Sequence, residues 1–490
     1  MTIGRRSILR LAGPALAAPF SAWAADEPVH EHAVAQNAPT EKPDYTLRIA
    51  TGLAELAPEH VVSTALYNDQ FPGPLLRFTE GKRIVIAIQN DTDTPELVHW
   101  HGQTIPVDVD GAAEEGSPFI PPHSTQQIAF IPKPSGLRYV HSHVRAGSDL
   151  TRGTFSGQAA PVYIEPKLNP GAYDREVFLV LKEFNPSLTQ TGDMDQDFLA
   201  GEPLRELRAI GVAADAKSQG WPRGYEVGYE LFSINGKMLG QGDPIRVRQG
   251  ERVLFHIVNA SATENRSLAL PGHVFRVVAL DGNPVPTQAE VPVLWLGTAE
   301  RISAIVEMKH PGVWVMGDLA DDDRGHGMGI VVEYAGKTGK PVWVQPKPFL
   351  WDYTLFGTST APATPDETIE MTFEMRNAAA HGFNLWMING EAFSMETMRP
   401  MFQLHEGRRY RLKFHNASDD IHPLHLHRHS FELTRVAGKA TSGIVKDVVM
   451  LGSFQELEVD FTADNPGRTL FHCHMQQHMD FGFMALFDYV

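Results

Sequence analysis

One pattern occurs three times along the 490 residues, at intervals of about 160 residues. In each copy a glycine precedes a run of alternating apolar residues, and the run ends at an asparagine. The copies run from Tyr67 to Asn90, from Ile234 to Asn259 and from Ile388 to Asn416, and their glycines are Gly81, Gly250 and Gly407. The units of solenoid proteins repeat every 20–50 residues or so, whereas a longer interval indicates duplication of a whole domain. The sequence therefore predicts three copies of one domain.

Strand-like alternation dominates these copies, for example in residues 83–88, 252–258 and 409–414, and helical periodicity is scarce. The 42 glycines and 35 prolines suit many short strands joined by turns. This pattern is typical of β-sandwiches. An all-β fold is therefore predicted, with domains at 40–167, 173–336 and 348–490. The polar stretch 185–226 is interpreted as an insertion in the middle domain, with a short helix near 203–214.

Histidines recur in His-x-His pairs, in which both rings project from one face if the pair lies on a strand. The four pairs are His99/His101, His141/His143, His425/His427 and His472/His474. Two pairs belong to the first predicted domain and two to the third. The eight imidazoles can therefore converge on one cluster between these domains, which leaves the middle domain as a spacer and one wall of a substrate cleft.

Cys473 is the only cysteine, so it forms no disulfide within the chain. On a strand it points away from the face shared by His472 and His474. His422 and His478 complete a set of two imidazoles and one thiolate around it, which are ligands that suit a blue-copper electron-transfer site. One strand is thus predicted to contact two metal sites, with the cysteine backbone as the short connection between them.

Together these motifs resemble the four copper signatures of the multicopper oxidases, the family of laccases, ascorbate oxidase and bacterial cuprous oxidases. They read His99-Trp-His-Gly, His141-Ser-His, His422-Pro-Leu-His-Leu-His and His472-Cys-His followed by His478 and Phe483. The resemblance implies three cupredoxin-like Greek-key sandwiches and four copper ions. It places His422, Cys473 and His478 on the type 1 copper, and His99 and His425 on the type 2 copper. The type 3 pair then takes His101, His141, His143, His427, His472 and His474.

The resemblance also gives Phe483 and Asp110 expected roles. Phe483 stands where many relatives have an axial methionine, and a phenyl ring cannot ligate, which predicts a raised type 1 potential. A slip of one residue would bring Met484 to that place, but strand alternation disfavours it. Asp110 matches an acidic position that orients cluster water or relays protons, and a turn aspartate before Gly111 is the alternative. Asp447 is expected to fix the end of a strand.

The predicted activity is that of a laccase-like oxidase, which passes electrons singly from phenols or aromatic amines to O₂ and forms water. A second reading makes the donor a metal ion, Cu(I), Fe(II) or Mn(II), and its mark would be acidic or thioether groups beside His422 and His478. A third reading is a periplasmic copper-binding protein without turnover. One chain carries both halves of the cluster, so a monomer suffices.

The first 24 residues are predicted to be a twin-arginine export signal. Arg5 and Arg6 precede an apolar run and the small-residue pattern Ala22-Trp23-Ala24. The apolar run is too short to anchor the protein in a bilayer. We therefore expect a periplasmic or secreted protein. The formal net charge of −17 argues against nucleic acid and anionic membranes as partners.

Overall fold

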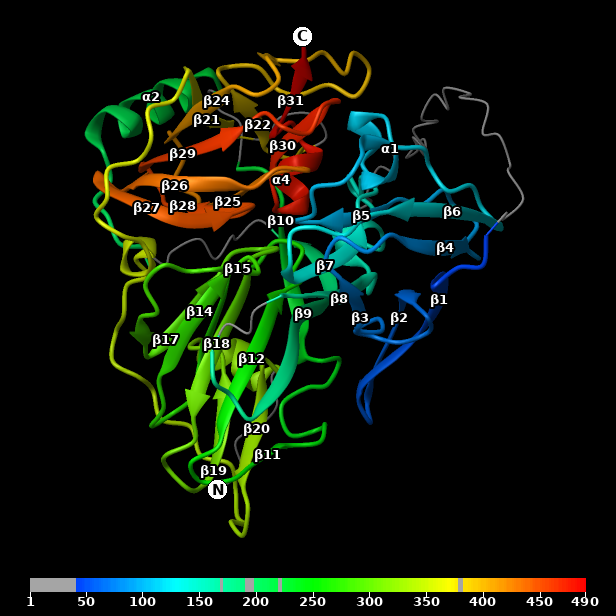
Figure 1. The fold of residues 1–490 in the computed structure, drawn as a ribbon, viewed down its shortest axis with the longest axis vertical. Helices are drawn as coiled ribbons and strands as arrows, with labels where there is room; N and C mark the ends of the chain where they lie inside the picture. The colour runs from blue at the N-terminus through cyan, green and yellow to red at the C-terminus, as the bar shows by residue number, and fades with distance from the viewer. Residues whose placement is uncertain (1–40, 168–170, 190–197, 219–222, 378–381) are drawn as a thin grey trace, which may run out of the picture. The chain divides into compact units, whose positions relative to one another are not determined.

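The computed structural model describes residues 41–167, 171–189, 198–218, 223–377 and 382–490. The predicted export signal at 1–24 lies outside these ranges. Strands dominate the described part of the chain and form six sheets. The sheets pair into three sandwiches, coloured blue to cyan, green, and orange to red in Figure 1. The prediction of an all-β chain with three cupredoxin-like domains is thereby confirmed.

The first sandwich places the sheet β2-β1-β4-β6 against the sheet β3-β8-β7-β5. Apolar side chains of both sheets share one core, in which Trp100 is fully buried against Phe78 and Phe130. Its strands are β1 Tyr45–Ala57, β2 His60–Tyr67, β3 Leu76–Thr79, β4 Ile84–Asn90, β5 Val98–His101, β6 Ser124–Phe130, β7 Gly136–Ser142 and β8 Ala159–Glu165, and the short helix α1 covers Val107–Asp110.

The second sandwich consists of a sheet ordered β10-β9-β12-β18-β14-β15 and a sheet ordered β11-β20-β19-β13-β17. Between β9 and β10, helix α2 (Arg205–Asp215) confirms the short helix predicted in the insertion and lies against β21 of the third sandwich. The strands are β9 Arg175–Thr189, β10 Glu226–Ile234, β11 Ile245–Val247, β12 Arg252–Asn259, β13 Arg266–Ala269, β14 Phe275–Leu280, β15 Asn283–Pro284, β16 Glu290–Val291, β17 Val293–Leu296, β18 Arg301–Glu307, β19 Val313–Gly317 and β20 Gly329–Tyr334, with helix α3 at Asp321–Gly325.

The third sandwich repeats this plan with sheets ordered β22-β21-β24-β29-β26-β27 and β23-β31-β30-β25-β28. Its strands are β21 Glu367–Arg376, β22 Leu385–Ile388, β23 Phe402–Leu404, β24 Arg409–Asn416, β25 His422–Leu426, β26 Phe431–Val436, β27 Lys439–Lys446, β28 Val448–Leu451, β29 Glu456–Thr462, β30 Thr469–Cys473 and β31 Met484–Tyr489. Helix α4 (Gln476–Asp480) joins β30 to β31.

The repeated asparagine has the same structural role in all three sandwiches. Asn90, Asn259 and Asn416 are each fully buried at the end of a strand. Each side-chain amide donates to at least two backbone carbonyls of neighbouring segments, for example Asn416 to Asp420 at 2.7 Å and to Gly452 at 2.9 Å. A buried carbonyl without a partner is costly, so these amides fix the loops that follow the strands. In the third copy, that loop leads into the strand that begins at His422.

Two pairs of neighbouring strands carry the histidine motifs. β5 pairs with β7, which places His99 opposite His141, and β25 pairs with β30, which places His425 opposite His472. The corresponding strands of the middle sandwich, β13 and β19, contain no histidine. The fold therefore brings four motifs that are distant in sequence onto two adjacent strand pairs.

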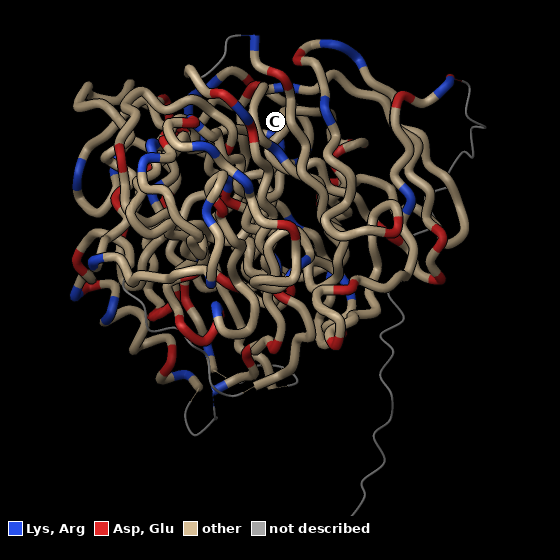
Figure 2. The backbone as a smooth tube through the Cα atoms, turned by 90° about the horizontal axis from the view of Figure 1, so that it is seen from below, with Lys and Arg blue, Asp and Glu red and all other residues tan. Residues whose placement is uncertain are grey.

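In the described part of the chain, no helix is long and apolar enough to span a bilayer. Lys and Arg are interspersed with Asp and Glu along the backbone in the view of Figure 2.

Candidate functional site

The eight histidines of the four His-x-His pairs form one buried cluster. Their exposed fractions are all 3% or less. Rings from the first and third sandwiches stack on each other, with centroids 3.9 Å apart for His101 and His425 and 4.1 Å apart for His99 and His427. The cluster therefore lies where these two sandwiches meet.

Within the cluster, candidate ligand atoms gather in threes, each set having its atoms within 4.8 Å of one another. The sets are His101/His141/His474, His143/His427/His472 and His99/His101/His425. The first two sets together contain the six residues predicted for the type 3 pair. The third contains both residues predicted for the type 2 copper.

His143 and His474 each lie one residue past a strand end, where alternation along the strand no longer dictates side-chain direction. Backbone hydrogen bonds hold them instead, from the amide of His474 to the carbonyl of Pro423 at 2.7 Å and from His143 to Leu97 at 3.4 Å. After His474, helix α4 and a turn precede the next strand, and β31 starts at Met484.

Cys473 forms a second, separate set with two histidines. Its Sγ lies 3.7 Å from Nδ1 of His422 and 3.6 Å from Nδ1 of His478. His422 comes from the neighbouring strand β25 and His478 from helix α4, and the ring of Trp386 covers His478 at 4.0 Å. The thiol is fully buried. The cysteine side chain therefore belongs to one set while the rings on either side of it belong to the other.

Phe483 and Met484 lie in different environments. Phe483 is fully buried, and its ring lies 4.8 Å from that of His422 and 5.9 Å from that of Trp386. Met484 packs in another apolar cluster together with Leu470. The phenyl ring therefore faces the cysteine set, and the thioether faces away from it.

Burial favours the neutral form of nine of these imidazoles, because desolvation penalises the charged ring. It holds the pKa of His101, His141, His143, His422, His425, His427 and His474 well below the ordinary value, and it lowers the pKa of His472 and His478 to about 3. Burial likewise raises the pKa of the Cys473 thiol. A thiolate in this position thus requires a cation beside it.

In most of these rings one nitrogen is hydrogen-bonded to an oxygen atom at the edge of the cluster, and the other nitrogen faces the centre of the cluster. Nδ1 donates to a backbone carbonyl from His99 (Asp110, 3.0 Å), His141 (Ser142, 2.9 Å), His425 (Asp447, 2.7 Å) and His472 (Cys473, 2.8 Å). His101 is turned the other way, with Nε2 on the carboxylate of Asp447 at 3.1 Å. Such partners select the tautomer of a metal-binding histidine.

The donor set fits copper. Nε2 of His99, Nε2 of His425 and Nδ1 of His474 are buried with no hydrogen-bond partner. Nε2 of His427 and Nε2 of His472 lie only 3.0 Å apart. Neutral imidazoles that point lone pairs at one another need cations between them, and a site of imidazole and thiolate is one that copper favours.

Asp110 ends helix α1 and is fully buried against the cluster. Its Oδ2 lies 2.9 Å from Nδ1 of His427 and 3.1 Å from Nδ1 of His99, so it contacts rings of two sandwiches. Two further carboxylates, which no sequence motif singled out, lie nearby: Glu115 at 3.7 Å from Nδ1 of His427 and Glu114 at 3.7 Å from Nδ1 of His143. Their position shortly after Asp110 was the only signal in the sequence.

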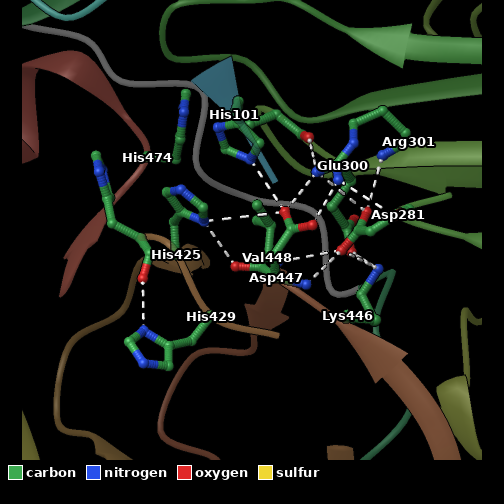
Figure 3. Close-up of polar contacts among 12 residues, drawn as sticks. His101, Asp281, Glu300, Arg301, His425, His429, Lys446, Asp447, Val448 and His474 are labelled. Atoms are coloured by element: carbon green, nitrogen blue, oxygen red, sulfur yellow. Dashed lines mark hydrogen bonds and ion pairs between the residues drawn. The ribbon is translucent and has the colours of Figure 1, made fainter. Parts of the chain in front are cut away.

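Asp447 lies at a strand end, between β27 and β28, as expected, but its contacts extend further. It is fully buried and contacts His101 and His425 (Figure 3). Its carboxylate is bound by Arg301 of the middle sandwich. The middle sandwich therefore reaches the cluster and does more than separate its neighbours.

Sequence models of the multicopper oxidase family match residues 50–169, 209–334 and 360–490, most of the chain. Over 441 residues the chain is 29% identical to multicopper oxidase MmcO of Mycobacterium tuberculosis, covering 88% of this chain and 84% of that protein. The fold is similar to that of the laccase from Botrytis aclada, with a TM-score of 0.71 and 18% identity over 90% of this chain and 87% of the laccase. It is also similar to a multicopper oxidase from Campylobacter jejuni described as a metallo-oxidase, with a TM-score of 0.66 and 20% identity over 92% and 93% of the two chains.

Proposed function

Because this chain belongs to the multicopper oxidase family, which are O₂-reducing copper oxidoreductases, we propose that it is a laccase-like oxidase. It takes electrons one at a time from small reductants such as phenols and aromatic amines, and it reduces O₂ to two waters with four of them. One observation carries the proposal: the Cys473 side chain lies in one candidate copper set, and its neighbours His472 and His474 lie in the other.

We assign four copper ions to these sets. His422, Cys473 and His478 would hold the type 1 ion, His99 and His425 the type 2 ion, and the sets His101/His141/His474 and His143/His427/His472 the type 3 pair. Copper bound there would supply the one-electron redox chemistry that links donor oxidation to O₂ reduction.

The protein connects the two sites by the shortest covalent route available. His472 and Cys473 are consecutive, and Nδ1 of His472 donates to the carbonyl oxygen of Cys473 at 2.8 Å. This hydrogen bond also fixes the ring so that Nε2 faces the cluster. Asp110 orients His427 and His99 in the same way from the other side.

The surroundings of His478 favour aromatic donors. Gln477, the preceding residue, donates to the carbonyl of Tyr225, whose side chain is 36% exposed. The ring of Tyr225 packs edge-on against Phe383 at 5.7 Å, and Phe383 stacks on Phe481 at 4.2 Å. Tyr225 is the exposed ring of this group, and Phe383 behind it is buried. An exposed aromatic ring binds planar apolar molecules by stacking and by burying apolar surface. A phenol seated there lies beside the helix that carries His478.

A second candidate donor is a metal ion, which three carboxylates near His422 favour. Asp419 is exposed, Asp420 is buried, and burial raises the pKa of Glu226 to about 7. Arg223 lies 3.7 Å from Asp420 and 4.0 Å from Asp419, and its charge opposes a cation there. Aromatic donors are therefore the first choice.

We also propose export by the twin-arginine route, on the basis of Arg5 and Arg6 and the apolar run that follows them. Replacing both arginines by lysine is expected to retain the protein in the cytoplasm. Equal amounts of wild type and variant outside the cytoplasmic membrane would contradict this proposal.

A donor panel under O₂ tests the proposed function. Copper-loaded protein is given phenols, aromatic amines, Cu(I), Fe(II) and Mn(II) at matched concentrations, and O₂ uptake is recorded. We expect the highest kcat/KM with an aromatic donor and four donor electrons per O₂. Preference for a metal ion would select the second candidate. Copper binding without O₂ uptake for any donor would indicate a copper-binding protein without turnover.

A further inference from the structure

We propose that Asp447 is a positioning residue through which the middle sandwich orients two rings of the histidine cluster, His101 and His425. The proposal rests on the proposed function in one respect, namely that the cluster binds copper. Figure 3 shows Asp447 between these two imidazoles and the charged side chains of the middle sandwich.

Asp447 contacts the two rings through different atoms. Its Oδ1 lies 3.1 Å from Nε2 of His101, and its backbone carbonyl accepts a hydrogen bond from Nδ1 of His425 at 2.7 Å. The two rings stack with centroids 3.9 Å apart, at an interplanar angle of 16°. One residue of the third sandwich thus holds a stacked pair that joins the first and third sandwiches.

The contact with His101 decides which ring nitrogen faces the cluster. A neutral imidazole carries one N–H, and Asp447 accepts it from Nε2, so the lone pair lies on Nδ1. Nδ1 of His101 is 3.4 Å from Nε2 of His141, inside the cluster. Without a carboxylate at this point, nothing in this contact would favour one tautomer or one ring orientation of His101 over the other.

Arg301 of the middle sandwich holds that carboxylate in place. Its Nη1 and Nη2 donate to Oδ1 and Oδ2 of Asp447, each at 2.6 Å, in the two-pronged geometry in which a guanidinium binds a carboxylate best. Arg138 of the first sandwich adds a longer contact to Oδ2 at 3.3 Å. All three side chains are fully buried.

Asp281, also of the middle sandwich, holds the backbone on which the contact with His425 depends. Its Oδ2 accepts from the amides of Asp447 at 3.2 Å and Val448 at 3.1 Å, and it pairs with Lys446 at 2.9 Å. These bonds fix the chain between β27 and β28, and with it the Asp447 carbonyl that orients His425. Arg301 thus holds the carboxylate that contacts His101, and Asp281 holds the backbone that contacts His425; the two are themselves joined, since the Arg301 amide donates to Oδ1 of Asp281 at 3.0 Å.

The charges of this buried network balance. Three cations, Arg138, Arg301 and Lys446, face three carboxylates, Asp281, Asp447 and Glu300, and all six are buried. Buried charges persist only when they are paired, and removing one partner leaves another uncompensated. A rigid arrangement of this kind suits the orientation of ligands, because it has few alternative arrangements.

Gly102, the residue after His101, shows how tightly this network closes over the strand. A Cβ built there would lie 2.5 Å from Nη2 of Arg301 and 2.7 Å from Oδ2 of Asp447. The backbone at Gly102 has φ +77°, which other residues rarely adopt. The glycine of His99-Trp-His-Gly therefore gives the middle-sandwich guanidinium its access to the carboxylate.

The experiment measures copper release from the holoenzyme of Arg301→Lys. Lysine keeps the charge but cannot make the two-pronged bond. Wild type and variant are incubated with a copper chelator, and copper content is followed together with the thiolate absorption that reports the Cys473 site. Loss of an outer partner of a metal-binding histidine typically weakens metal binding 10- to 100-fold or so. We expect copper release from the cluster to accelerate by about that factor, with the thiolate absorption retained.

The matched control is Arg266→Lys, which alters another buried arginine of the middle sandwich, on β13 and paired with Asp323. It is expected to release copper as wild type does. Equal release from Arg301→Lys and wild type, or equal loss from both sites, would overturn the proposal. If Arg301→Lys does not fold, Asp447→Asn is judged by the same outcomes. A wild-type protein that binds no copper would instead sink the proposed function.

Discussion

Nδ1 of His472 donates a hydrogen bond of 2.8 Å to the carbonyl oxygen of Cys473, the next residue in the chain. The imidazole that faces the histidine cluster and the thiol that faces away from it are thus joined by one peptide unit and by a hydrogen bond across that unit. Strand alternation points the two side chains to opposite faces, and the hydrogen bond links the His472 ring to the backbone of Cys473. The two candidate copper sets are therefore coupled within two residues of one strand.

The side chain at position 483 is expected to influence the reduction potential of copper bound at the Cys473 site. In Phe483→Met, a thioether replaces the phenyl ring beside His422 and stabilises the oxidised copper, so the reduction potential should fall. Potentiometric titration of the thiolate absorption measures it. Met484→Leu is the control, because that side chain packs in a different cluster, and its potential should equal that of wild type. An unchanged potential in Phe483→Met would remove this residue from control of the site.

Asp110 is expected to govern turnover through the rings of His99 and His427. Asp110→Asn keeps the shape but weakens the acceptor, and O₂ turnover should fall about 10- to 100-fold while the colour of the Cys473 site persists. Asp108→Asn, on the same short helix but exposed, should retain full activity. Steady-state O₂ uptake with copper content measured on the same sample makes the comparison. Full turnover in copper-replete Asp110→Asn would show that its carboxylate takes no part.

Alanine substitutions at two glycines with the same φ angle distinguish the cost of backbone strain from the cost of a steric clash. Gly102 and Gly81 both have φ +77°, but a Cβ at Gly81 would have nothing within 4 Å. An alanine at either position costs about 1–2 kcal/mol for the left-handed conformation. Gly102→Ala should lose about 1–3 kcal/mol more, because its methyl group collides with Arg301 and Asp447. Equal unfolding midpoints for the two variants would contradict the close approach.

Glu96 predicts a pH dependence of stability. Burial raises the pKa of this carboxyl to about 7, against an ordinary value of 4.5. A folded state that holds the proton more tightly is stabilised below pH 4.5, and it loses that contribution as the pH rises through 7. The stability of Glu96→Gln relative to wild type should therefore increase by about 1–3 kcal/mol as the pH rises from 4.5 to 7, and this difference should persist at higher pH. Urea unfolding at pH 4.5, 6 and 8 measures the difference, and parallel profiles would contradict the prediction.

The sequence predicted those parts of the fold and site that depend on short-range pattern. Alternating runs that end at Asn90, Asn259 and Asn416 identified the three sandwiches, because each asparagine binds backbone carbonyls within its own sandwich. The His-x-His spacing placed pairs of rings on one strand face, because a strand repeats every two residues. These signals are local and need no knowledge of the partner strand.

The role of Asp447 could not be predicted in this way. It depends on Arg301, which is 146 positions away, and on His101, which is 346 positions away, and these come from the other two sandwiches. In the sequence Asp447 is an aspartate between two strands, and no spacing links it to either partner. The directions of His143 and His474 were also outside the pattern, because both lie beyond their strands.

The most direct test of the connection through Cys473 is O₂ uptake by copper-loaded Cys473→Ser with an aromatic donor, with copper quantified per chain. The account predicts that the variant loses the type 1 copper and its colour, keeps the three ions of the histidine cluster, and no longer takes up O₂ at the expense of the donor. Uptake equal to that of wild type, in a variant with the cluster fully occupied, would contradict it.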